Sequence, residues 1–437
     1  LQDRLNGISK HIGQPAAPAP IWGRLKALAP KAAGSLRALH TNTGRLCTSA
    51  QAVEAEVRST RPFWLTPPPS LDEGLLKSLQ EYQQYSVPMP AMPVPPQEHF
   101  QQVIIASADS SPGLDGIPYS AYRLVPRQAA GLLSAYLQEL VHNPASIQPP
   151  QPLLVWIPKA DAGMKADNWR PLGMPTTFHR LLAAGIYTHL ARNISTLLHP
   201  SQALLNHFRE PQGNFLDVEL HLRTFHKGNA AVLATDFVKA FELVNPNWIM
   251  RVLKARGAPI WLLAYVRFTL YGRKVIPKIK GRVLPGLYVL NGVDMGSAIS
   301  PLLFCLAIDP LLTLLNRVPR PPSSLTNRRP KFSRAYMDDN QVCGQGVAWI
   351  VPVQKLYEQF STAGLQTVQH SCCSFTSFPE PTDGSSWTPG GPSWTIAARK
   401  ALNWFPQAAR FLTSTGKVLE RLQVLKLTLG RAPDRSE

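Results

Sequence analysis

The chain has 437 residues, of which 45 are lysine or arginine and 27 are aspartate or glutamate, so its formal net charge is +18. Hydrophobic residues make up 44% of it, which excludes a disordered chain and suffices for two or three compact domains. The basic excess favours a polyanionic partner, nucleic acid before an anionic membrane surface, although a soluble protein with a basic face would carry the same charge.

Membrane and metal-thiolate classes are disfavoured as well. No apolar run reaches the roughly 18 to 20 residues that a membrane-spanning helix needs, so we expect no membrane partner. The five cysteines are scattered without paired C-x-x-C spacing, which indicates a reducing, intracellular compartment and no thiol-bound metal. The first residue is Leu1 and not methionine, which suggests a fragment of a longer reading frame.

Composition changes along the chain. Residues 1–99 are rich in proline and alanine and are expected to form a loosely folded lead-in or linker, with short helices at 50–59 and 71–85. Between 100 and 375, apolar runs of strand length alternate with amphipathic helices, a pattern typical of an α/β or an α+β protein. Residues 376–437 begin with a stretch rich in proline, glycine and serine and continue as a basic helical segment. The function is therefore expected to lie in the middle part.

Three aspartates stand where the pattern places the ends of buried strands. Asp236 follows the apolar run 230–234, and Asp338 and Asp339 lie at the turn of a strand–turn–strand pattern over 334–342. Adjacent carboxylates repel each other, and burying them costs several kcal/mol unless cations neutralise them. Two divalent cations would do so, and hard oxygen ligands suit Mg²⁺. Ordinary turn chemistry at 338–339 and a helix N-cap at Asp236 are the alternatives.

Five segments of the chain resemble the motifs of reverse transcriptases, most closely those of non-LTR (LINE-type) retrotransposons. In chain order they are residues 111–118, 157–159 with 168–172, 236–241, 291–304 and 336–339. The first two resemble the finger motifs of the family, and the last three resemble polymerase motifs A, B and C. Any one match could be chance, but five in the family's order could hardly be.

The resemblance implies a right-hand polymerase. Fingers are expected at 100–225, a palm with an antiparallel sheet backed by helices at 226–375, and a divergent or partial thumb at 376–437. The implied function is RNA-directed DNA synthesis by target-primed reverse transcription. Its partners would be an RNA template, a DNA primer or target and deoxynucleoside triphosphates, and its cofactor Mg²⁺ or Mn²⁺. The resemblance also implies action in the nucleus and leaves the oligomeric state open.

The resemblance assigns catalytic roles to the carboxylates. Asp236, Asp338 and Asp339 would hold two metal ions that deprotonate the primer hydroxyl, and the backbone carbonyl of Phe237 would be a further ligand. Phe241 matches the steric gate of the family, a ring that collides with the 2′-hydroxyl of a ribonucleotide. Without the resemblance, Phe241 would be taken as an aromatic core residue about one helical turn after Asp236.

Three further residues are implied in substrate binding. Lys159 and Arg170 lie on either side of a polar loop, so a β-hairpin would bring them together as a clamp for the triphosphate. Gly296 precedes the helix of motif B and would let the backbone approach the base pair closely. Cations on a hairpin are otherwise ordinary solvated charges, which is the alternative for Lys159 and Arg170.

Some positions depart from the family's pattern. Met295 replaces the usual glutamine of motif B, and Val368 and Ser371 replace the asparagine and lysine of motif D. Because that lysine is thought to protonate the pyrophosphate, its loss removes a general acid, and His370 is a candidate substitute. The endonuclease, primer grip and thumb patterns are not evident in the chain. An impaired remnant that binds RNA and an intron-maturase-like protein are therefore the alternative functions.

Overall fold

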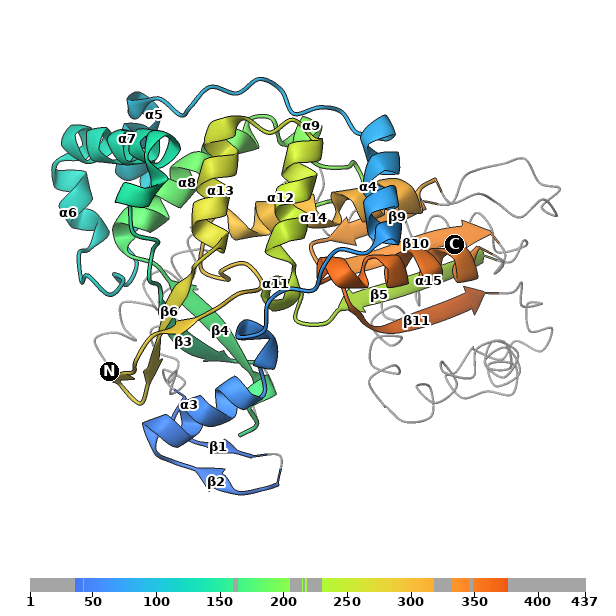
Figure 1. Cartoon of the computed structure of the whole chain (residues 1–437), viewed down its shortest axis with the longest axis horizontal. Coiled ribbons are helices and arrows are strands. Elements are labelled where there is room, and N and C mark those ends of the chain that lie inside the picture. The colour runs from blue at the N-terminus through green and yellow to red at the C-terminus, as the bar shows by residue number, and fades with distance from the viewer. Residues whose placement is uncertain are drawn as a thin grey trace, which may run out of the picture. The chain divides into compact units, whose positions relative to one another are not determined.

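The computed structural model describes residues 36–41, 43–159, 164–204, 230–317, 332–345 and 349–375, together with residues 214 and 217. It has a mixed α+β structure, so the α+β part of the predicted fold is confirmed (Figure 1). Contacts divide it into two compact units. Of the described residues, the smaller unit combines those up to Pro62 with Leu153–Gly173 and Ile276–Leu287, and the larger unit holds the others.

The smaller unit is built on a mixed sheet with the strand order β4-β3-β6-β7, to which β8 adds by pairing with β6. Strands β3 and β6 run parallel, and β6 and β7 form an antiparallel hairpin. A two-stranded antiparallel sheet, β1-β2, and helix α3 complete the unit. The elements are β1 (Leu39–His40), β2 (Leu46–Cys47), α3 (Ala50–Ser59), β3 (Leu153–Pro158), η3 (Ala166–Asn168), β4 (Trp169–Met174), β6 (Lys274–Ile279), β7 (Arg282–Val283) and β8 (Leu287–Tyr288).

Arg61 links the helical and sheet parts of this unit. Its side chain is only 1% exposed. Its guanidinium lies 5.3 Å from the ring centre of Trp156 on β3 and donates a 2.9 Å hydrogen bond to the carbonyl of Trp169 on β4. A buried guanidinium needs such partners, because its desolvation is otherwise unfavourable.

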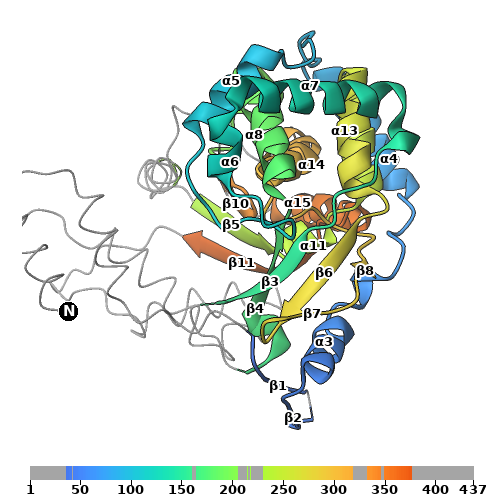
Figure 2. The ribbon, with the colours of Figure 1, turned by 90° about the vertical axis from the view of Figure 1, so that its left-hand side faces the viewer.

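The helices of the larger unit surround α14 (Ser300–Leu315), which packs against α4 and α12 and is enclosed in the helical part (Figure 2). Every residue of α14 except Pro301 is buried, as expected for a helix that is apolar on all sides. The other helices are η1 (Pro62–Trp64), α4 (Glu73–Tyr85), α5 (Gln97–Ala106), α6 (Tyr119–Leu124), α7 (Pro126–His142), η2 (Pro144–Ser146), α8 (Thr177–Ala191), α9 (Ile194–Leu197), α11 (Ala240–Leu243), α12 (Pro246–Ala255), α13 (Ile260–Leu270), α15 (Ile350–Gln359) and η4 (Ser361–Ala363).

A four-stranded antiparallel sheet lies beside these helices, with the order β11-β5-β10-β9 (Figure 1). Its strands are β5 (Ala230–Phe237), β9 (Phe332–Tyr336), β10 (Asp339–Gln345) and β11 (Thr367–Phe375). Leu233 and its register partner Val342 are fully buried in the core that α14 and α15 share. The alternate positions Ala234 and Gln341 are only half-buried. Towards the end that carries Asp236, the sheet therefore has one face on the core and one more open face, whereas Val232 and Cys343, further along the latter face, are buried.

Several expectations about the fold can be compared with this structure. The helix expected at 50–59 has these bounds, and the one expected at 71–85 begins at Glu73. Leu75 and Tyr82 of α4 are fully buried in the core, which is unlike a loosely folded linker. The domain limits expected at 99, 225 and 375 remain predictions, and the expected thumb, 376–437, lies outside the described residues. Among the described helices, none is both long and apolar enough to span a membrane.

Candidate active site

The turn between β9 and β10 carries two of the three predicted carboxylates. Tyr336 and Asp339 are register partners that close the hairpin, so Met337 and Asp338 form a two-residue turn. The strand–turn–strand pattern is confirmed, but Asp339, which was also expected at the turn, is the first residue of β10. Met337 has a φ of 54°, in the left-handed region that non-glycine residues rarely adopt. Asp338 is half-buried and Asp339 is exposed. The hairpin therefore presents two adjacent carboxylates at one end of the sheet.

Asp236 stands at the same end of the sheet, on the neighbouring strand. Asn340 is the register partner of Thr235, so the next position of the antiparallel ladder aligns Asp339 with Asp236. Thr235 and Asn340 are buried on the core side, and Asp236 is half-buried on the more open side. The structure thus places Asp236 at the same end of the sheet as the Asp338–Asp339 pair, which lies far from it in the sequence.

The position of Asp338 is also visible in the electrostatics of α14. Burial raises the pKa of the Cys305 thiol, and the negative charges of Asp309 and Asp338 raise it further. Asp338 therefore lies near enough to α14 for its charge to act on a buried residue of that helix. A cation at the carboxylates would reduce this unfavourable field.

The donor set fits hard divalent cations. Three carboxylates and the neighbouring backbone carbonyls at the end of β5 supply only oxygen, the ligand that Mg²⁺ and Mn²⁺ prefer. Within the described ranges, no group of three or more His, Cys, Asp or Glu side chains is arranged to hold a metal ion by itself. A cation at this site would therefore complete its coordination with substrate phosphate and water, as is usual for Mg²⁺.

The residue after Asp236 is held by aromatic packing. The ring of Phe237 is 3% exposed and contacts the rings of Phe304 and Tyr357, with centroids 6.4 and 6.2 Å away. Its backbone joins β5 to β11, because Thr367 is its register partner. The predicted carbonyl ligand therefore belongs to a residue that is held by the packing of its ring and by the pairing of its backbone with β11. Its role as a ligand remains a prediction.

Phe241 lies on α11, the short helix that follows β5. Its ring stacks on that of Phe304 from α14 and is only partly buried. The backbone of Phe241 is tied to motif B, since its carbonyl accepts a 2.7 Å hydrogen bond from the amide of Val293. Gly292 permits this close approach: it has a φ of 79°, and a Cβ there would lie 2.5 Å from the Phe241 carbonyl oxygen.

The loop of motif B is anchored by a buried arginine. Arg273 donates to the Asp294 carboxylate at 2.9 Å and to the Asn291 carbonyl at 2.7 Å. The side-chain amide of Asn291 in turn donates to the carbonyls of Phe63 and Thr66. These contacts fix the loop just before Met295 and Gly296, which form a half-buried turn ahead of α14. The expected role of Gly296 remains a prediction.

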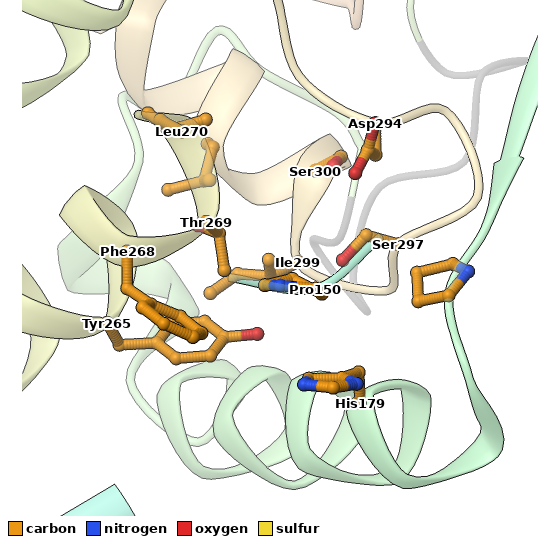
Figure 3. A pocket seen from close by; sticks show the side chains of 12 residues that line it. Pro150, His179, Tyr265, Phe268, Thr269, Leu270, Asp294, Ser297, Ile299 and Ser300 are labelled. Atoms are coloured by element: carbon orange, nitrogen blue, oxygen red, sulfur yellow. The ribbon is translucent and has the colours of Figure 1, made fainter. Parts of the chain in front are cut away.

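A pocket opens beside this loop, between α8, α13 and the start of α14 (Figure 3). Asp294, Ser297 and Ser300 line it together with His179. The imidazole of His179 is hydrogen-bonded to the hydroxyls of Thr176, at 2.7 Å, and Tyr136, at 3.1 Å. Burial lowers the pKa of His179 to about 4, so this wall of the pocket is neutral at physiological pH.

Lys159 and Arg170 belong to the smaller unit. The amide of Lys159 donates a 2.9 Å hydrogen bond to the carbonyl of Asn168, which closes the hairpin that the sequence predicts. Both cationic side chains are exposed, one just after β3 and the other near the start of β4. The carboxylates belong to the larger unit, so the clamp on the triphosphate remains a prediction.

The register of β11 brings motif D to the same sheet. Gln369 is the register partner of Asp236, and His370 is the partner of Thr235, after an irregularity that includes Val368. Ser371 follows opposite Ala234. Gln369, which the sequence did not single out, is thus the backbone neighbour of Asp236 on this side. The suggested role of His370 remains a prediction.

Some residues that organise the site carry a weak sequence signal or none. The pair Asn291–Gly292 is typical of a left-handed backbone position and could have indicated the tight turn of motif B. Phe304 lies within the predicted motif B, but nothing local indicates its contact with Phe241. Arg273 forms its ion pair across 21 residues of sequence, which no short-range pattern predicts.

Comparison with known proteins identifies the family of the chain. Residues 157–378 match the family model "Reverse transcriptase (RNA-dependent DNA polymerase)". The chain belongs to the reverse transcriptase family, and its relatives are proteins of non-LTR retrotransposons. The five motif resemblances therefore identified the family correctly.

Three relatives illustrate the extent of the similarity. The "Transposon TX1 uncharacterized 149 kDa protein" of Xenopus laevis is 24% identical over 287 residues, 64% of this chain and 22% of that protein. The Pol polyprotein from the type-2 retrotransposable element R2DM of Drosophila melanogaster is 30% identical over 214 residues, 48% of this chain and 20% of that protein. A Pol polyprotein from a type-1 element R2 of Popillia japonica is 26% identical over 207 residues, 46% and 34% of the two chains. The matches thus cover between a fifth and about a third of these relatives.

Proposed function

We propose that the chain is the RNA-directed DNA polymerase of a non-LTR retrotransposon. The observation that carries the proposal is the alignment of Asp236 on β5 with Asp339 on the adjacent antiparallel strand β10, directly after the turn that holds Asp338. In a family of RNA-dependent DNA polymerases, such an oxygen-rich sheet end is suited to phosphoryl transfer. We further propose that this sheet with α14 and α15 is the palm of a right-hand polymerase, within 226–375, and that 100–225 are its fingers.

The reaction forms a bond between the primer 3′-oxygen and the α-phosphorus of a deoxynucleotide, while the bond to the pyrophosphate oxygen breaks. Divalent cations, when bound, lower the pKa of the 3′-hydroxyl and neutralise charge on the transferring phosphoryl group. Asp236 and Asp338 would hold these cations with the Phe237 carbonyl, and Asp339 would stand beside them. The primer's proton leaves to water, and pyrophosphate departs with the charge of the broken bond.

Substrate selection follows from the remaining site residues. Phe241 would exclude the 2′-hydroxyl of a ribonucleotide, because its stacked ring has little freedom to withdraw. Lys159 and Arg170 would bind the triphosphate, for which a bidentate guanidinium is well suited. Gly296 and Met295 would contact the nascent base pair, the methionine through apolar contact and without the hydrogen bonds of a glutamine amide.

The relatives suggest the biological setting. They are proteins of transposable elements. We therefore propose RNA as the template, a nicked DNA target as the primer and the nucleus as the place of action. Met295 and Ser371 favour one second candidate, a remnant that retains RNA binding but has lost efficient polymerisation.

Primer extension distinguishes these two functions. The full chain is incubated with an RNA template, a DNA primer, deoxynucleotides and Mg²⁺ or Mn²⁺, beside Asp338→Ala. Glu81→Ala serves as the matched control, because it removes an exposed carboxylate from α4. Extension by the parent and by Glu81→Ala, and none by Asp338→Ala, would support the proposal. A folded parent that binds RNA but extends no primer would contradict it and favour the remnant.

A further inference from the structure

Residues 199–204, which we call the support segment, lie along β9 and reach the turn that carries Asp338. Gln202 and Ala335 form a parallel bridge. The amide of Ala335 donates to the carbonyl of Ser201 at 2.8 Å, and the amide of Ala203 donates to the carbonyl of Ala335 at 2.8 Å. The support segment therefore continues the sheet beyond β9 by one short extended stretch.

The side chain of Gln202 contacts the turn directly. Its amide oxygen accepts a 3.0 Å hydrogen bond from the backbone amide of Met337 and a 3.1 Å bond from that of Leu204. Gln202 is 1% exposed, so water does not compete for these bonds. Its side-chain nitrogen is buried with no hydrogen-bond partner among the described residues. The oxygen is thus the atom by which this side chain acts on the turn.

The turn needs such support because its backbone is strained. Met337 is left-handed, with a φ of 54°, and this conformation is unfavourable by about 1 to 2 kcal/mol for a residue with a Cβ. Strained backbone persists only where surrounding contacts determine it. The bond from Met337 to Gln202 spans 135 residues of sequence and supplies a contact from outside the hairpin.

Buried charges fix the beginning of the support segment. The amide of His199 donates to the carboxylate of Asp309 on α14. That carboxylate also accepts from the hydroxyl of Tyr82 at 2.6 Å and from Arg256 at 3.1 Å. Arg256 reaches the carbonyl of Thr196 at 2.8 Å as well. Because Arg256 and Asp309 are both about 3% exposed, breaking this cluster would leave a buried charge unpaired.

A second polar cluster fixes the segment to β9 and to the end of α14. The hydroxyl of Ser333 donates to that of Ser201 at 3.0 Å. The side-chain amide of Asn316 donates to the hydroxyl of Ser333 at 2.7 Å, and its oxygen accepts from the amide of Ser333 at 3.0 Å. The support segment is therefore anchored at His199 and at Ser201, directly before Gln202, to α14 and to the C-cap residue of that helix.

We propose that Gln202 is a positioning residue for the active site: its side-chain oxygen holds the Met337–Asp338 turn in the conformation that presents Asp338 to a divalent cation. The inference rests on the proposed function for the identity of the site. The geometry that carries it is independent of nucleic acid, because all of its contacts lie within the larger unit.

The test compares two substitutions that differ in one property. Gln202→Met keeps a side chain of similar length and removes the acceptor oxygen, whereas Gln202→Glu keeps an acceptor for both amides. Leu75→Ala, a fully buried position on α4, controls for general destabilisation. In the full chain without nucleic acid, we would measure hydrogen–deuterium exchange of the peptide containing Met337, and Mn²⁺ affinity by electron paramagnetic resonance.

Gln202→Met is expected to accelerate exchange at the turn and to weaken Mn²⁺ binding about tenfold, the effect of losing the hydrogen bond that Met337 donates. Gln202→Glu should keep both properties near the parent values. Leu75→Ala should alter neither property, even where its melting temperature is as low as that of Gln202→Met. Unchanged exchange and Mn²⁺ affinity in Gln202→Met, or equal losses in Leu75→Ala, would overturn the inference. Neither measurement uses a primer, so the outcome is separate from that of the extension assay.

Discussion

The ring of Phe241 lies almost flat against that of Phe304, with centroids 5.2 Å and planes 18° apart. Phe304 is fully buried in α14, whereas Phe241 belongs to the four-residue helix α11. Phe241, the proposed steric gate, therefore packs against α14, the most deeply buried helix of the larger unit. Such a stacked pair contributes about 0.5 to 1.5 kcal/mol beyond the area it buries.

Phe304→Leu should weaken sugar selection without removing the gate. Losing the stacking energy gives Phe241 more freedom, so we expect the preference for deoxynucleotides over ribonucleotides to fall about two- to tenfold. The measurement is the ratio of kcat/KM for the two nucleotide types. Phe100→Leu, a buried aromatic on α5, is the control and should keep the ratio. Equal selectivity in Phe304→Leu and the parent would show that the stack does not hold the gate.

Gly292→Ala should destabilise the protein strongly. A Cβ at this position would lie 2.5 Å from the Phe241 carbonyl oxygen and 2.6 Å from that of Glu242, in addition to the strain of a φ of 79°. We expect a loss of more than about 3 kcal/mol in the free energy of unfolding, measured with urea.

Gly257→Ala is a matched control for this prediction. Gly257 has a φ of 68°, but nothing lies within 4 Å of an added Cβ. Only the backbone strain remains there, so the expected loss is about 1 kcal/mol. Similar losses in the two variants would mean that the loop of motif B can move away from α11 at little cost, so that the added Cβ does not clash.

His179 should make the larger unit sensitive to acid. Burial lowers its pKa to about 4, below the value of 6.5 expected when it is unfolded. The folded state therefore binds fewer protons than the unfolded state at these pH values. The contribution of neutral His179 to the free energy of unfolding is fully present above pH 6.5 and is lost as the pH falls towards 4. The loss is at most about 3 kcal/mol. Urea unfolding of the parent and His179→Gln across this range measures it.

The exposed His142→Gln provides the comparison. Its stability should follow that of the parent over the whole range, whereas His179→Gln should show a shallower decline with acid. A parent and a His179→Gln variant that decline in parallel would contradict the burial of a neutral imidazole beside the pocket.

Ser371→Lys should increase turnover. A lysine at this position would restore the general acid expected to protonate pyrophosphate, a type of catalysis that contributes about 100-fold or more. We expect at least about a tenfold rise in the single-turnover rate of primer extension. Ser371→Met matches the bulk of the new side chain but cannot donate a proton, so it should give no rise. An equal gain in both variants would point to packing along β11.

Part of this structure could be predicted from sequence because the relevant signals are local. The continuous apolar run before Asp236 and the strand–turn–strand pattern around Asp338 and Asp339 indicated strand ends and a turn, and the register then aligned them. Helix α3 has the bounds that were predicted, and the structure adds a local cap, because the side-chain oxygen of Ser49 accepts from the amide of Ala52.

The remaining features depend on contacts between distant residues. Gln202 meets Met337 across 135 residues, and no short-range pattern marks a glutamine whose oxygen is directed at a turn. The burial of α4 could not be foreseen either, because its packing against α14 follows from tertiary contacts and its proline-rich surroundings are typical of a linker.

The smaller unit has a consequence for how such a chain can change by recombination. Its central parallel pair joins Leu153 of β3 to Ile276 of β6, and the chain between them belongs mostly to the other unit. If two related genes recombine between the codons for β3 and those for β6, the product pairs a β3 strand from one parent gene with a β6 strand from the other. Exchange of gene segments between related elements should therefore succeed only where the two parental sheets are compatible, so these strands are expected to be inherited together.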